Sequence, residues 1–329
     1  MTRRLVPLLV GLALLGAACA GSGSQVSPSL FAPVTTTTTT TAPSAAATPT
    51  PGCTGGTHGT VVESTRPPAS MPAPGNMPAG SFMKTIQDRG KLIVGTSADQ
   101  LLFGYVNPLD GQIEGFDVDL LKAIAAAIFP GDPSSHIQIV TLTLAQRIPK
   151  VVDGSVDIVA ETMTINCARR GKVDFSTEYY DAGQKVLVRR DSTAAGIQDL
   201  GGKKVCSAAG STSIDNIAQA PSHPVPFPVA DQSDCLVLFQ QGAVDAISTD
   251  DTVLAGLAAQ DPYAKVVGEP FTDEPYGTAI SLKHPEFTSF VNGVLDRMRA
   301  DGSLQALYQR WLGAIFPKLP GIPPARYKA

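Results

Sequence analysis

Short runs of β-branched residues alternate with helical segments from Lys91 onward, and this alternation limits the possible folds more than any other feature of the chain. A first series contains the strand-like runs "KLIVGTS", "IQIVTL" and "VDIVAET" and the helical run "DVDLLKAIAAAIF". A second series runs through "KVLVRR", "KKVCSA", "VDAISTD" and "AKVVGE" and closes with "TAISLK". Such alternation is typical of parallel sheets that are covered by helices. We therefore expect an α/β protein with two sheets.

Two helices have clear signals in the sequence. The first is expected to use Asp117 as its N-cap, because apolar residues follow at spacings of three and four: Leu120, Leu121, Ile124, Ala127 and Ile128. The last is expected after the break at Asp301 and Gly302, with one apolar face made of Leu304, Leu307, Tyr308, Trp311, Leu312 and Ile315. Each helix therefore has a face to bury.

Polar residues collect at one recurring place, directly after the predicted strands. They are Ser97, Thr162, Thr164, Ser211, Thr212 and Asp250. Taken singly, each serine or threonine is as well explained by a turn or a helix N-cap. Their shared position favours a binding role, because ligands of open α/β sheets bind outside the carboxyl ends of the strands. Two such sheet edges facing each other would form a cleft for a small ligand.

The N-terminus has the pattern of an export signal over residues 1–18. Arg3 and Arg4 precede an apolar run from Leu5 to Ala18, which is too short to span a bilayer. The run ends in "LGAAC", which resembles a lipobox, although Gly16 stands where a leucine is usual. We expect cleavage and lipid attachment at Cys19, so that the protein is anchored to the extracytoplasmic face of the cell membrane. An ordinary secretory signal with an incidental cysteine is the alternative.

Residues 19–80 are expected to form a lipidated, disordered tether. This segment is rich in Ser, Thr, Pro, Ala and Gly, it contains an unbroken threonine run from Thr35 to Thr41, and it has almost no apolar periodicity. Such a composition cannot bury enough apolar surface to offset the entropy of ordering. The folded body is therefore expected to begin at about Ser81. O-glycosylation of the tether is left open.

Six motifs, matched in order, carry a resemblance to a known family over about residues 81–313. They are "KLIVGTS", "GQIEGFDVDLLKAIA", "QRIPKVVDGSVDIVAETMTINCARRGKVDFSTEYY", "DLGGKKVCSAAGSTS", "LFQQGAVDAISTDD" and "GSLQALYQRWLG". With them the chain resembles the family 3 extracellular solute-binding proteins, the polar amino-acid receptors of ABC importers. The resemblance is strongest to the glutamate- and glutamine-binding lipoproteins of actinobacteria.

The resemblance implies a two-lobed type II periplasmic-binding-protein fold whose lobes are joined by two hinge crossovers. Lobe 1 would comprise residues 81–182 and 278–329, and lobe 2 residues 183–277. The lobes would close on an amino acid in the cleft between them. The protein would be a monomeric receptor and not an enzyme.

The resemblance also implies roles for individual residues. Arg169, five residues after Thr164, would hold the ligand α-carboxylate, which needs a planar, always-charged donor once water is removed. Asp250 would accept the ligand ammonium, with its neighbour Asp251 pointing elsewhere. Thr162 would offer a carbonyl to the ammonium. The donors to the carboxylate from lobe 2 would come from Gly210, Ser211 and Thr212. Arg170 is expected to face water beside acidic residues.

The side-chain pocket departs from that of the glutamine receptors. Gln100 and Leu144 stand where those receptors have stacking aromatics, Ser97 replaces an acid, and Ala208 replaces a lysine. Arg147 matches an arginine that reaches the distal carboxylate in receptors for acidic amino acids. A second buried cation suits a dicarboxylic ligand, so glutamate or aspartate is favoured and glutamine or asparagine comes next. Failing that role, Arg147 is a rim or helix-capping residue.

Five cysteines leave an even number once Cys19 is assigned to lipid. The remaining four, Cys53, Cys167, Cys206 and Cys235, suit two disulfides in an oxidising compartment. The sequence does not choose among three connectivities. The implied lobe boundaries put Cys206 and Cys235 in one lobe, which favours that pair and leaves Cys53 with Cys167. Four reduced, buried thiols are the alternative.

Other function classes find little support. A net charge of −4 and the lack of a basic stretch interleaved with aromatics argue against nucleic acid. No metal-ligand spacing, phosphate loop or nucleophile elbow is present, so no metal or cofactor is expected. The four histidines, His58, His136, His223 and His284, lie away from the predicted site, which disfavours a cleft enzyme. An amino-acid sensor that presents its closed state to a membrane signalling partner stays open beside delivery to an ABC permease.

Overall fold

The computed structural model describes residues 53–55, 59–316 and 318–329. The predicted signal segment, the predicted lipidation site at Cys19 and most of the predicted tether lie outside the described residues. Within these residues, no helix is both long enough and apolar enough to cross a membrane.

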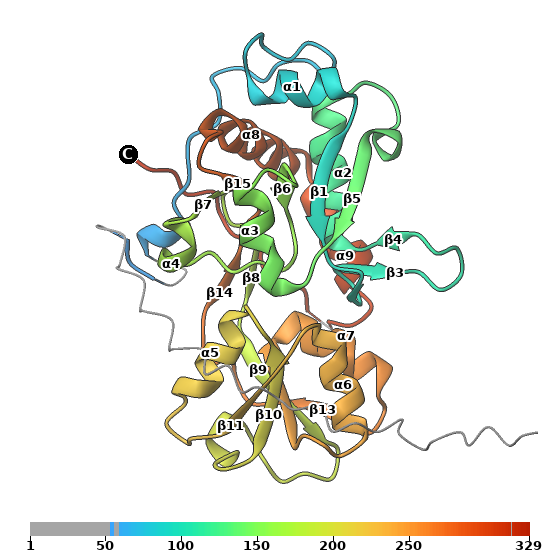
Figure 1. The fold of residues 1–329 in the computed structure, drawn as a ribbon, viewed down its shortest axis with the longest axis vertical. Helices are drawn as coiled ribbons and strands as arrows, with labels where there is room; N and C mark the ends of the chain where they lie inside the picture. Colours follow the sequence, from blue (N-terminus) through green and yellow to red (C-terminus); the bar gives the residue numbers. More distant parts are fainter. Residues whose placement is uncertain (1–52, 56–58, 317) are drawn as a thin grey trace, which may run out of the picture. The chain divides into compact units, whose positions relative to one another are not determined.

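The first lobe is built on a five-stranded sheet (Figure 1). Its strands, in spatial order, are β5 (Ile137–Thr141), β1 (Leu92–Thr96), β6 (Ile158–Val159), β15 (Ala279–Ser281) and β7 (Val173–Phe175). Strands β5, β1 and β6 are parallel, whereas β15 runs antiparallel to both of its neighbours. The last run of the second sequence series, β15, therefore returns to the first sheet.

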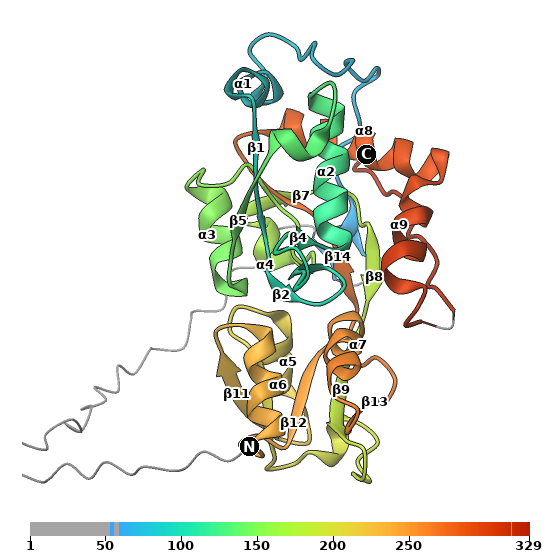
Figure 2. The ribbon, with the colours of Figure 1, turned by 90° about the vertical axis from the view of Figure 1, so that its right-hand side faces the viewer.

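Helices cover both faces of this sheet, as Figure 2 shows for α2 and α3 on opposite sides. One face carries α1 (Phe82–Arg89), α2 (Phe116–Ile128), α8 (Pro285–Asp301) and α9 (Ser303–Leu312). The other carries α3 (Arg147–Val152) and α4 (Cys167–Arg170). The apolar residues predicted for the face of α2 are buried, as are Leu304, Tyr308 and Leu312 of α9. Each face thus has a hydrophobic core.

The second lobe has its own five-stranded sheet. Its strands are, in spatial order, β11 (Val225–Val229), β10 (Lys204–Ala208), β12 (Ala246–Asp250), β9 (Gln184–Arg189) and β13 (Ala264–Val267). Strand β10 is parallel to both neighbours, and β9 is antiparallel to both of its own. The covering helices are α5 (Thr212–Gln219), α6 (Gln232–Gln240) and α7 (Asp251–Gln260). The parallel strands place several strand ends at one edge of the sheet.

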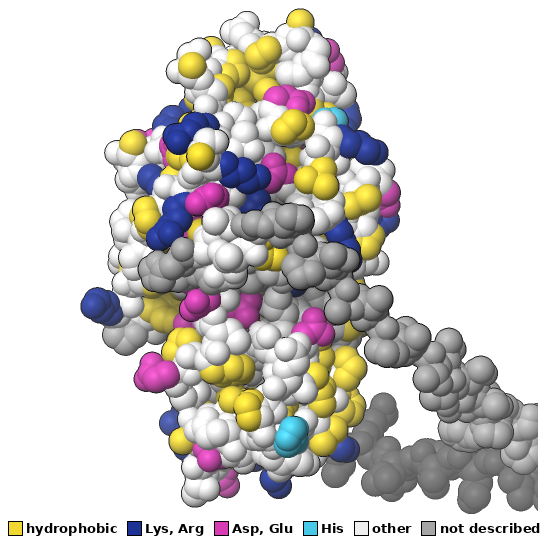
Figure 3. Space-filling view, turned by 90° about the vertical axis from the view of Figure 1, so that its left-hand side faces the viewer, with side chains coloured by type: hydrophobic (Ala, Val, Ile, Leu, Met, Phe, Trp, Pro, Cys, Tyr) yellow, Lys and Arg dark blue, Asp and Glu magenta, His cyan; other side chains and the backbone are white. Residues whose placement is uncertain are grey.

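Two antiparallel strands, β8 (Tyr180–Ala182) and β14 (Glu274–Tyr276), link the lobes. A small sheet of β2 (Asp99–Gln100), β3 (Gly104–Val106) and β4 (Ile113–Glu114) extends from lobe 1. Short 3-10 turns complete the described chain: Thr60–Val62, Pro133–His136, Leu144–Gln146 and Ile197–Asp199. On the face shown in Figure 3, acidic and basic side chains are interspersed over the first lobe.

Asp117 is not the N-cap of α2, contrary to the prediction. Gly115 caps this helix at φ 145°, a conformation that favours glycine, and its Cβ position would lie 2.2 Å from the Phe103 carbonyl oxygen. Asp117 lies in the first turn and is fully buried. Its Oδ1 accepts from Tyr179 Oη at 2.7 Å, and its Oδ2 accepts from the Thr162 amide at 2.8 Å. Tertiary partners, not the helix terminus, therefore use this carboxylate.

The predicted tether boundary at residue 80 is also wrong. Val61 and Val62 are buried in the core beneath α3 and α4, and Met77 is buried in the core on the opposite face of the sheet. Ser64 forms a β-bridge with Tyr327 and donates from Oγ to the Phe175 carbonyl at 2.6 Å. A few isolated apolar residues are enough to bind this segment to lobe 1, although they show no periodicity. The packed chain therefore reaches back at least to Thr60.

Both disulfides form in the favoured pairing. Cys206 and Cys235 join β10 to α6 inside lobe 2, and Cys53 and Cys167 join the N-terminal segment to α4. The second bond closes a loop with a sequence separation of 114 residues. It ties the N-terminal segment to the helix that carries Arg169.

Candidate functional site

A narrow cavity of about 10 Å³ lies between the two lobes. Lobe 1 contributes Gln100, Leu144, Arg147, Thr162, Thr164 and Arg169, and lobe 2 contributes Ser211, Thr212, Ser213, Gln232, Thr249, Asp250 and Val253. Five of these residues, Thr162, Thr164, Ser211, Thr212 and Asp250, lie at or just after the carboxyl end of a strand, where the sequence pattern predicted them. All predicted binding residues except Ser97 and Gly210 therefore line one cavity.

Two arginines of lobe 1 point their guanidinium groups toward the same carbonyl of lobe 2. Arg169 donates from Nη1 to the Thr164 carbonyl at 2.8 Å and from Nη2 to the Gly210 carbonyl at 3.2 Å. Arg147 donates from Nη2 to that same Gly210 oxygen at 3.3 Å. Burial and the neighbouring Arg147 lower the pKa of Arg169 to about 9, so it stays charged at neutral pH. The lobes are thus in contact, with two fixed cations at the junction.

Gly210 meets two conditions that favour glycine there. Its φ is 80°, and a Cβ would lie 2.6 Å from Cα of Ala145 in the other lobe. A side chain at this position would hold the lobes apart and move the carbonyl away from both arginines. The close approach of the lobes therefore depends on this glycine.

Asp250 supplies a buried carboxylate on the other side of the junction. Its Oδ2 accepts from Tyr276 Oη at 2.6 Å, whereas its Oδ1 is buried and has no hydrogen-bond partner within the described chain. Burial, with the neighbouring Glu274, raises its pKa well above the ordinary value. The neighbouring Asp251 accepts from the Gly183 and Thr252 amides and does not line the cavity. Asp250 can therefore accept from a cationic donor inside the cavity.

Thr162 has a strained backbone that other residues support. Its φ of 43° is rare for a β-branched residue and costs of order 1–3 kcal/mol. The Thr162 amide donates a hydrogen bond to the Asp117 carboxylate, and the Thr162 hydroxyl donates one to Gln100 Oε1 at 3.0 Å. Burial raises the pKa of Asp117 to about 6. This conformation fixes the direction of the peptide group at the cavity.

Glu274 joins the two lobes from the linking strand β14. Its Oε2 accepts from the hydroxyl of Thr164 in lobe 1 at 2.7 Å and from that of Thr212 in lobe 2 at 2.7 Å. Its Oε1 accepts from Asn216 Nδ2 at 3.1 Å and from the Thr272 hydroxyl at 2.8 Å. The side chain is nearly fully buried. One carboxylate thus holds both lobes in the closed arrangement.

Ser211 and Thr212 begin the helix that faces the cavity from lobe 2. Ser211 is the N-cap of α5: its Oγ accepts from the Ile214 amide at 3.1 Å and donates to the Ala208 carbonyl at 2.7 Å. Thr212 is the first helical residue. The capping alternative considered for Ser211 is therefore realised, and the same helix terminus also faces the cavity.

Comparison with known proteins defines the family. The model of the bacterial extracellular solute-binding proteins, family 3, matches residues 92–314. The chain belongs to this family. It is 35% identical over 231 residues to the ABC transporter glutamine-binding protein GlnH of Bacillus subtilis, covering 70% of this chain and 84% of that one. It is 33% identical over 254 residues to the glutamate-binding protein GluB of Corynebacterium glutamicum, covering 74% and 86%.

Solved structures agree with this assignment. An ancestral arginine-binding protein bound to glutamine is 33% identical with a TM-score of 0.63, covering 68% of this chain and 99% of that one. A mutant of ArgBP from T. maritima is 30% identical with a TM-score of 0.65, covering 70% and 99%. The fold is the two-lobed type II periplasmic-binding fold. The family and the relatives named here are solute-binding proteins, not enzymes.

Two expectations for this family 3 protein need correction. Ser97 does not line the cavity: it donates from Oγ to the Gly104 carbonyl at 2.8 Å and serves the small sheet. Arg170 does not face water, because its side chain is only 8% exposed, forms an ion pair with Asp174 and donates from Nε to the Val61 carbonyl. Arg170 binds the N-terminal segment, which the sequence had placed in the tether.

Several residues that line this cavity, or hydrogen-bond to residues that line it, were missed in the sequence. Gln232 follows the end of β11 just as the predicted residues follow their strands, so the same rule could have found it. Glu274 and Tyr276 lie inside a strand that links the lobes, where no strand-end rule applies. Their partners come from the other side of the junction, and only the folded chain reveals them.

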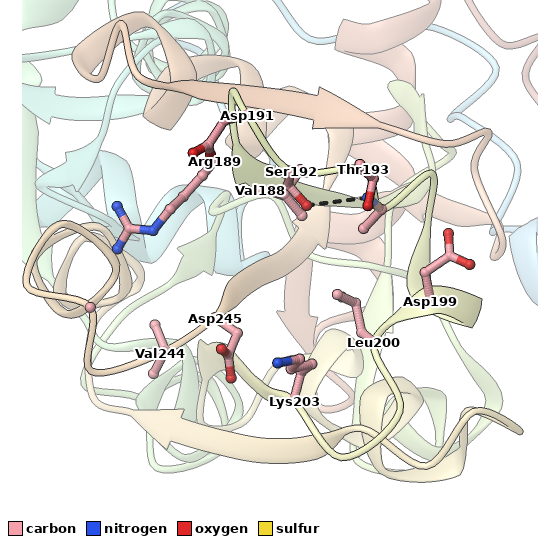
Figure 4. Close-up of a pocket in the computed structure, with 12 residues that line it drawn as sticks. Val188, Arg189, Asp191, Ser192, Thr193, Asp199, Leu200, Lys203, Val244 and Asp245 are labelled. Atoms are coloured by element: carbon pink, nitrogen blue, oxygen red, sulfur yellow. Dashed lines mark hydrogen bonds between the residues drawn. The ribbon is translucent and has the colours of Figure 1, made fainter.

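A second hollow lies on lobe 2 near the ends of β9, β10 and β12 (Figure 4). It contains none of the predicted residues, and Arg189 there donates to the Phe239 carbonyl at 2.8 Å. Asp245 accepts from the Lys204 amide at 2.8 Å. These charges have structural partners, so the interlobe cavity is the better candidate. Among the described residues, no group of acidic, histidine or cysteine side chains is arranged to hold a metal ion.

Proposed function

We propose that the protein is an extracytoplasmic receptor that binds a polar amino acid in the interlobe cavity and delivers it to an ABC importer. Arg169 holds the α-carboxylate, Asp250 holds the ammonium, and the carbonyl of Thr162 completes the ammonium site. Backbone N–H groups at the start of α5, which Ser211 caps and Thr212 begins, add donors to the carboxylate from lobe 2. The observation that carries this proposal is the pairing, inside one closed cavity, of a fixed cation with a carboxylate oxygen that has no partner in the described chain.

Closure would couple binding to delivery. The contacts of Gly210 with both arginines and of Glu274 with both threonines exist only when the lobes meet. A ligand that touches both lobes adds further contacts to the closed state and so shifts the population toward it. A membrane permease can then distinguish the loaded receptor from the empty one.

Glutamate or aspartate is our first choice of ligand, and glutamine or asparagine the second. Arg147 lines the cavity, and three of its donors serve the carbonyls of Leu144, Glu161 and Gly210. A guanidinium has five N–H donors, so Arg147 keeps donors for a distal carboxylate. The names of the relatives, a glutamine-binding and a glutamate-binding protein, support both choices.

We further propose that Cys19 carries a lipid that anchors a monomeric receptor to the cell membrane. The sequence pattern of residues 1–19 supports this proposal. Replacing Cys19 by Ala should release the protein from the membrane fraction of producing cells into the medium. Retention of the variant in the membrane fraction would contradict it.

A thermal-shift screen tests the proposed function. Ligands that bind only the native state raise the melting temperature, by an amount set by concentration over Kd. The purified protein is screened with each of the twenty amino acids, and we expect an increase with acidic or amide amino acids. If none of the twenty raises the melting temperature, the proposed function is wrong.

A further inference from the structure

Gln232 lines the cavity with a buried amide that is only half satisfied. It is the first residue of α6 in lobe 2 and is 1% exposed. Its Oε1 accepts from the Ala208 amide at 2.9 Å. Its Nε2 is buried and has no hydrogen-bond partner among the described residues. The side chain therefore brings a free donor to the edge of the cavity.

The orientation of this amide follows from its one hydrogen bond. A backbone N–H can only donate, so the atom that contacts Ala208 must be the carbonyl oxygen of the side chain. The group left without a partner is then the NH₂, which can only donate. A buried donor without an acceptor is unfavourable, so this NH₂ needs an acceptor that the described chain does not supply.

The threonine hydroxyls that donate at the cavity already have acceptors in the protein. The hydroxyls of Thr164 and Thr212 donate to Glu274, and that of Thr162 donates to Gln100. Among the described residues that line the cavity, two buried side-chain atoms stand without a partner, namely Asp250 Oδ1 and Gln232 Nε2. One is an acceptor and the other a donor, and both lie on lobe 2. A ligand with an ammonium and a separate acceptor oxygen would satisfy both.

We propose that Gln232 donates from Nε2 to an oxygen of the ligand side chain. The site then selects amino acids whose side chain ends in a carboxylate or a carboxamide. This inference rests on the proposed function, in which Arg169 holds the α-carboxylate and Asp250 the ammonium. Cationic side chains lack an acceptor and place a further donor against the Gln232 amide, whereas apolar side chains leave that amide unsatisfied.

Two substitutions test this role by calorimetric titration of the purified protein. Gln232→Glu keeps an oxygen for the Ala208 amide and replaces the donor by an acceptor. We expect the affinity of this variant for aspartate and glutamate to fall roughly 100-fold or more. Its affinity for asparagine and glutamine should fall less than about 10-fold, because the carboxamide of the ligand can turn its NH₂ toward the new carboxylate. Gln232→Leu should weaken acids and amides alike by roughly 10- to 100-fold. Gln241→Glu, an exposed change at the other end of α6, serves as the control and should leave all affinities unchanged.

The wild-type protein provides a test that needs no variant. Leucine has nearly the shape of asparagine but no side-chain acceptor, so we expect it to bind at least about 10-fold more weakly. Equal affinities for leucine and asparagine would overturn the inference even if the Gln232 variants fail to fold. Losses that are equal for acids and amides in Gln232→Glu, or affinities unchanged in both variants, would overturn it as well. If no amino acid binds the wild-type protein, the proposed function fails and this inference fails with it.

Discussion

The carboxylate of Glu274 should control how strongly the closed state is favoured. Its Oε2 accepts one hydroxyl from each lobe, from Thr164 and from Thr212, both at 2.7 Å. When the lobes separate, Oε2 can keep at most one of these two contacts. Glu274→Gln removes the charge while preserving the shape of the side chain. The substitution should therefore weaken the closed state more than the open state.

The size of the effect follows from the number of hydrogen bonds. A hydrogen bond to a charged group contributes about 1.5–3 kcal/mol, against about 0.5–1.5 kcal/mol for a neutral pair. Removing the charge thus costs about 1 kcal/mol for each hydroxyl, and about 1–2 kcal/mol of this is lost from the closed state alone. Because apparent affinity scales with the population of the competent state, ligand Kd should rise roughly 5- to 30-fold.

Isothermal titration calorimetry with a ligand from the thermal-shift screen measures this change directly. Small-angle scattering of the ligand-free protein should show a larger fraction of open molecules in the variant. Asp245→Asn is the control, because this carboxylate also accepts a hydrogen bond, from the Lys204 amide, but its partner lies in the same lobe. A Glu274→Gln protein whose Kd stays within about twofold of the wild type would refute the argument.

Three further changes give distinct outcomes. Arg147→Ala should weaken glutamate or aspartate more than the corresponding amide by calorimetry, whereas equal losses would remove the reason for preferring acids. Burial raises the pKa of Glu161 from 4.5 to about 8, so the folded state binds the proton of Glu161 more tightly than the unfolded state does, and stability falls as pH rises from about 4.5 to about 8. The variant Glu161→Gln should lack up to about 5 kcal/mol of this pH-dependent loss of stability. If the difference in unfolding free energy between pH 5 and pH 8 is the same in the variant as in the wild type, this prediction is wrong. Burial likewise raises the pKa of Glu178 to about 8, so this residue should contribute a further fall in unfolding free energy over the same pH range. Replacing Cys53 and Cys167 by serine removes a disulfide that joins residues separated by 114 positions in the sequence. In the chain-entropy account, this change should lower the free energy of unfolding by roughly 4–5 kcal/mol. A melting temperature that is unchanged under oxidising conditions would show that the bond contributes nothing to stability.

Much of the fold could be predicted because its signals are local. The alternation of strands and helices and the apolar faces of α2 and α9 depend on neighbours within a few residues. The local signal failed where one residue could either cap a helix or accept hydrogen bonds from distant parts of the chain. Asp117 resembles an N-cap, yet Gly115 takes that place, and the carboxylate accepts hydrogen bonds from Thr162 and Tyr179. Burial among distant partners outweighed the helix terminus.

The site shows the same division. The strand-end rule predicted Asp250 and the family motif predicted Arg169, and both residues line one cavity. The rule works because a parallel sheet places the carboxyl ends of its strands at a common edge. The rule could not predict that the Ser97 hydroxyl donates to the Gly104 carbonyl and does not reach the cavity, since any nearby carbonyl can accept a hydrogen bond from a hydroxyl. Glu274 was missed because its role depends on contacts between lobes.

The N-terminal segment shows a limit of composition as a guide. Residues 60–80 have the polar, proline-rich make-up of a tether, but Val61 and Val62 are buried against lobe 1. Arg170 binds this segment through the Val61 carbonyl. A few buried apolar side chains, together with hydrogen bonds and a disulfide, can order a segment whose average composition predicts disorder.

The central claim is that Arg169 and Asp250 hold the two groups that every α-amino acid shares. Calorimetric titration of Arg169→Ala and Asp250→Ala with the ligand found by thermal shift tests it most directly, with Asp251→Asn as the neighbouring control. Truncating one partner of a buried, hydrogen-bonded charge pair costs about 2–5 kcal/mol or more, so we expect binding of every amino acid to become undetectable at micromolar concentrations. Micromolar binding retained by either folded variant would contradict the account.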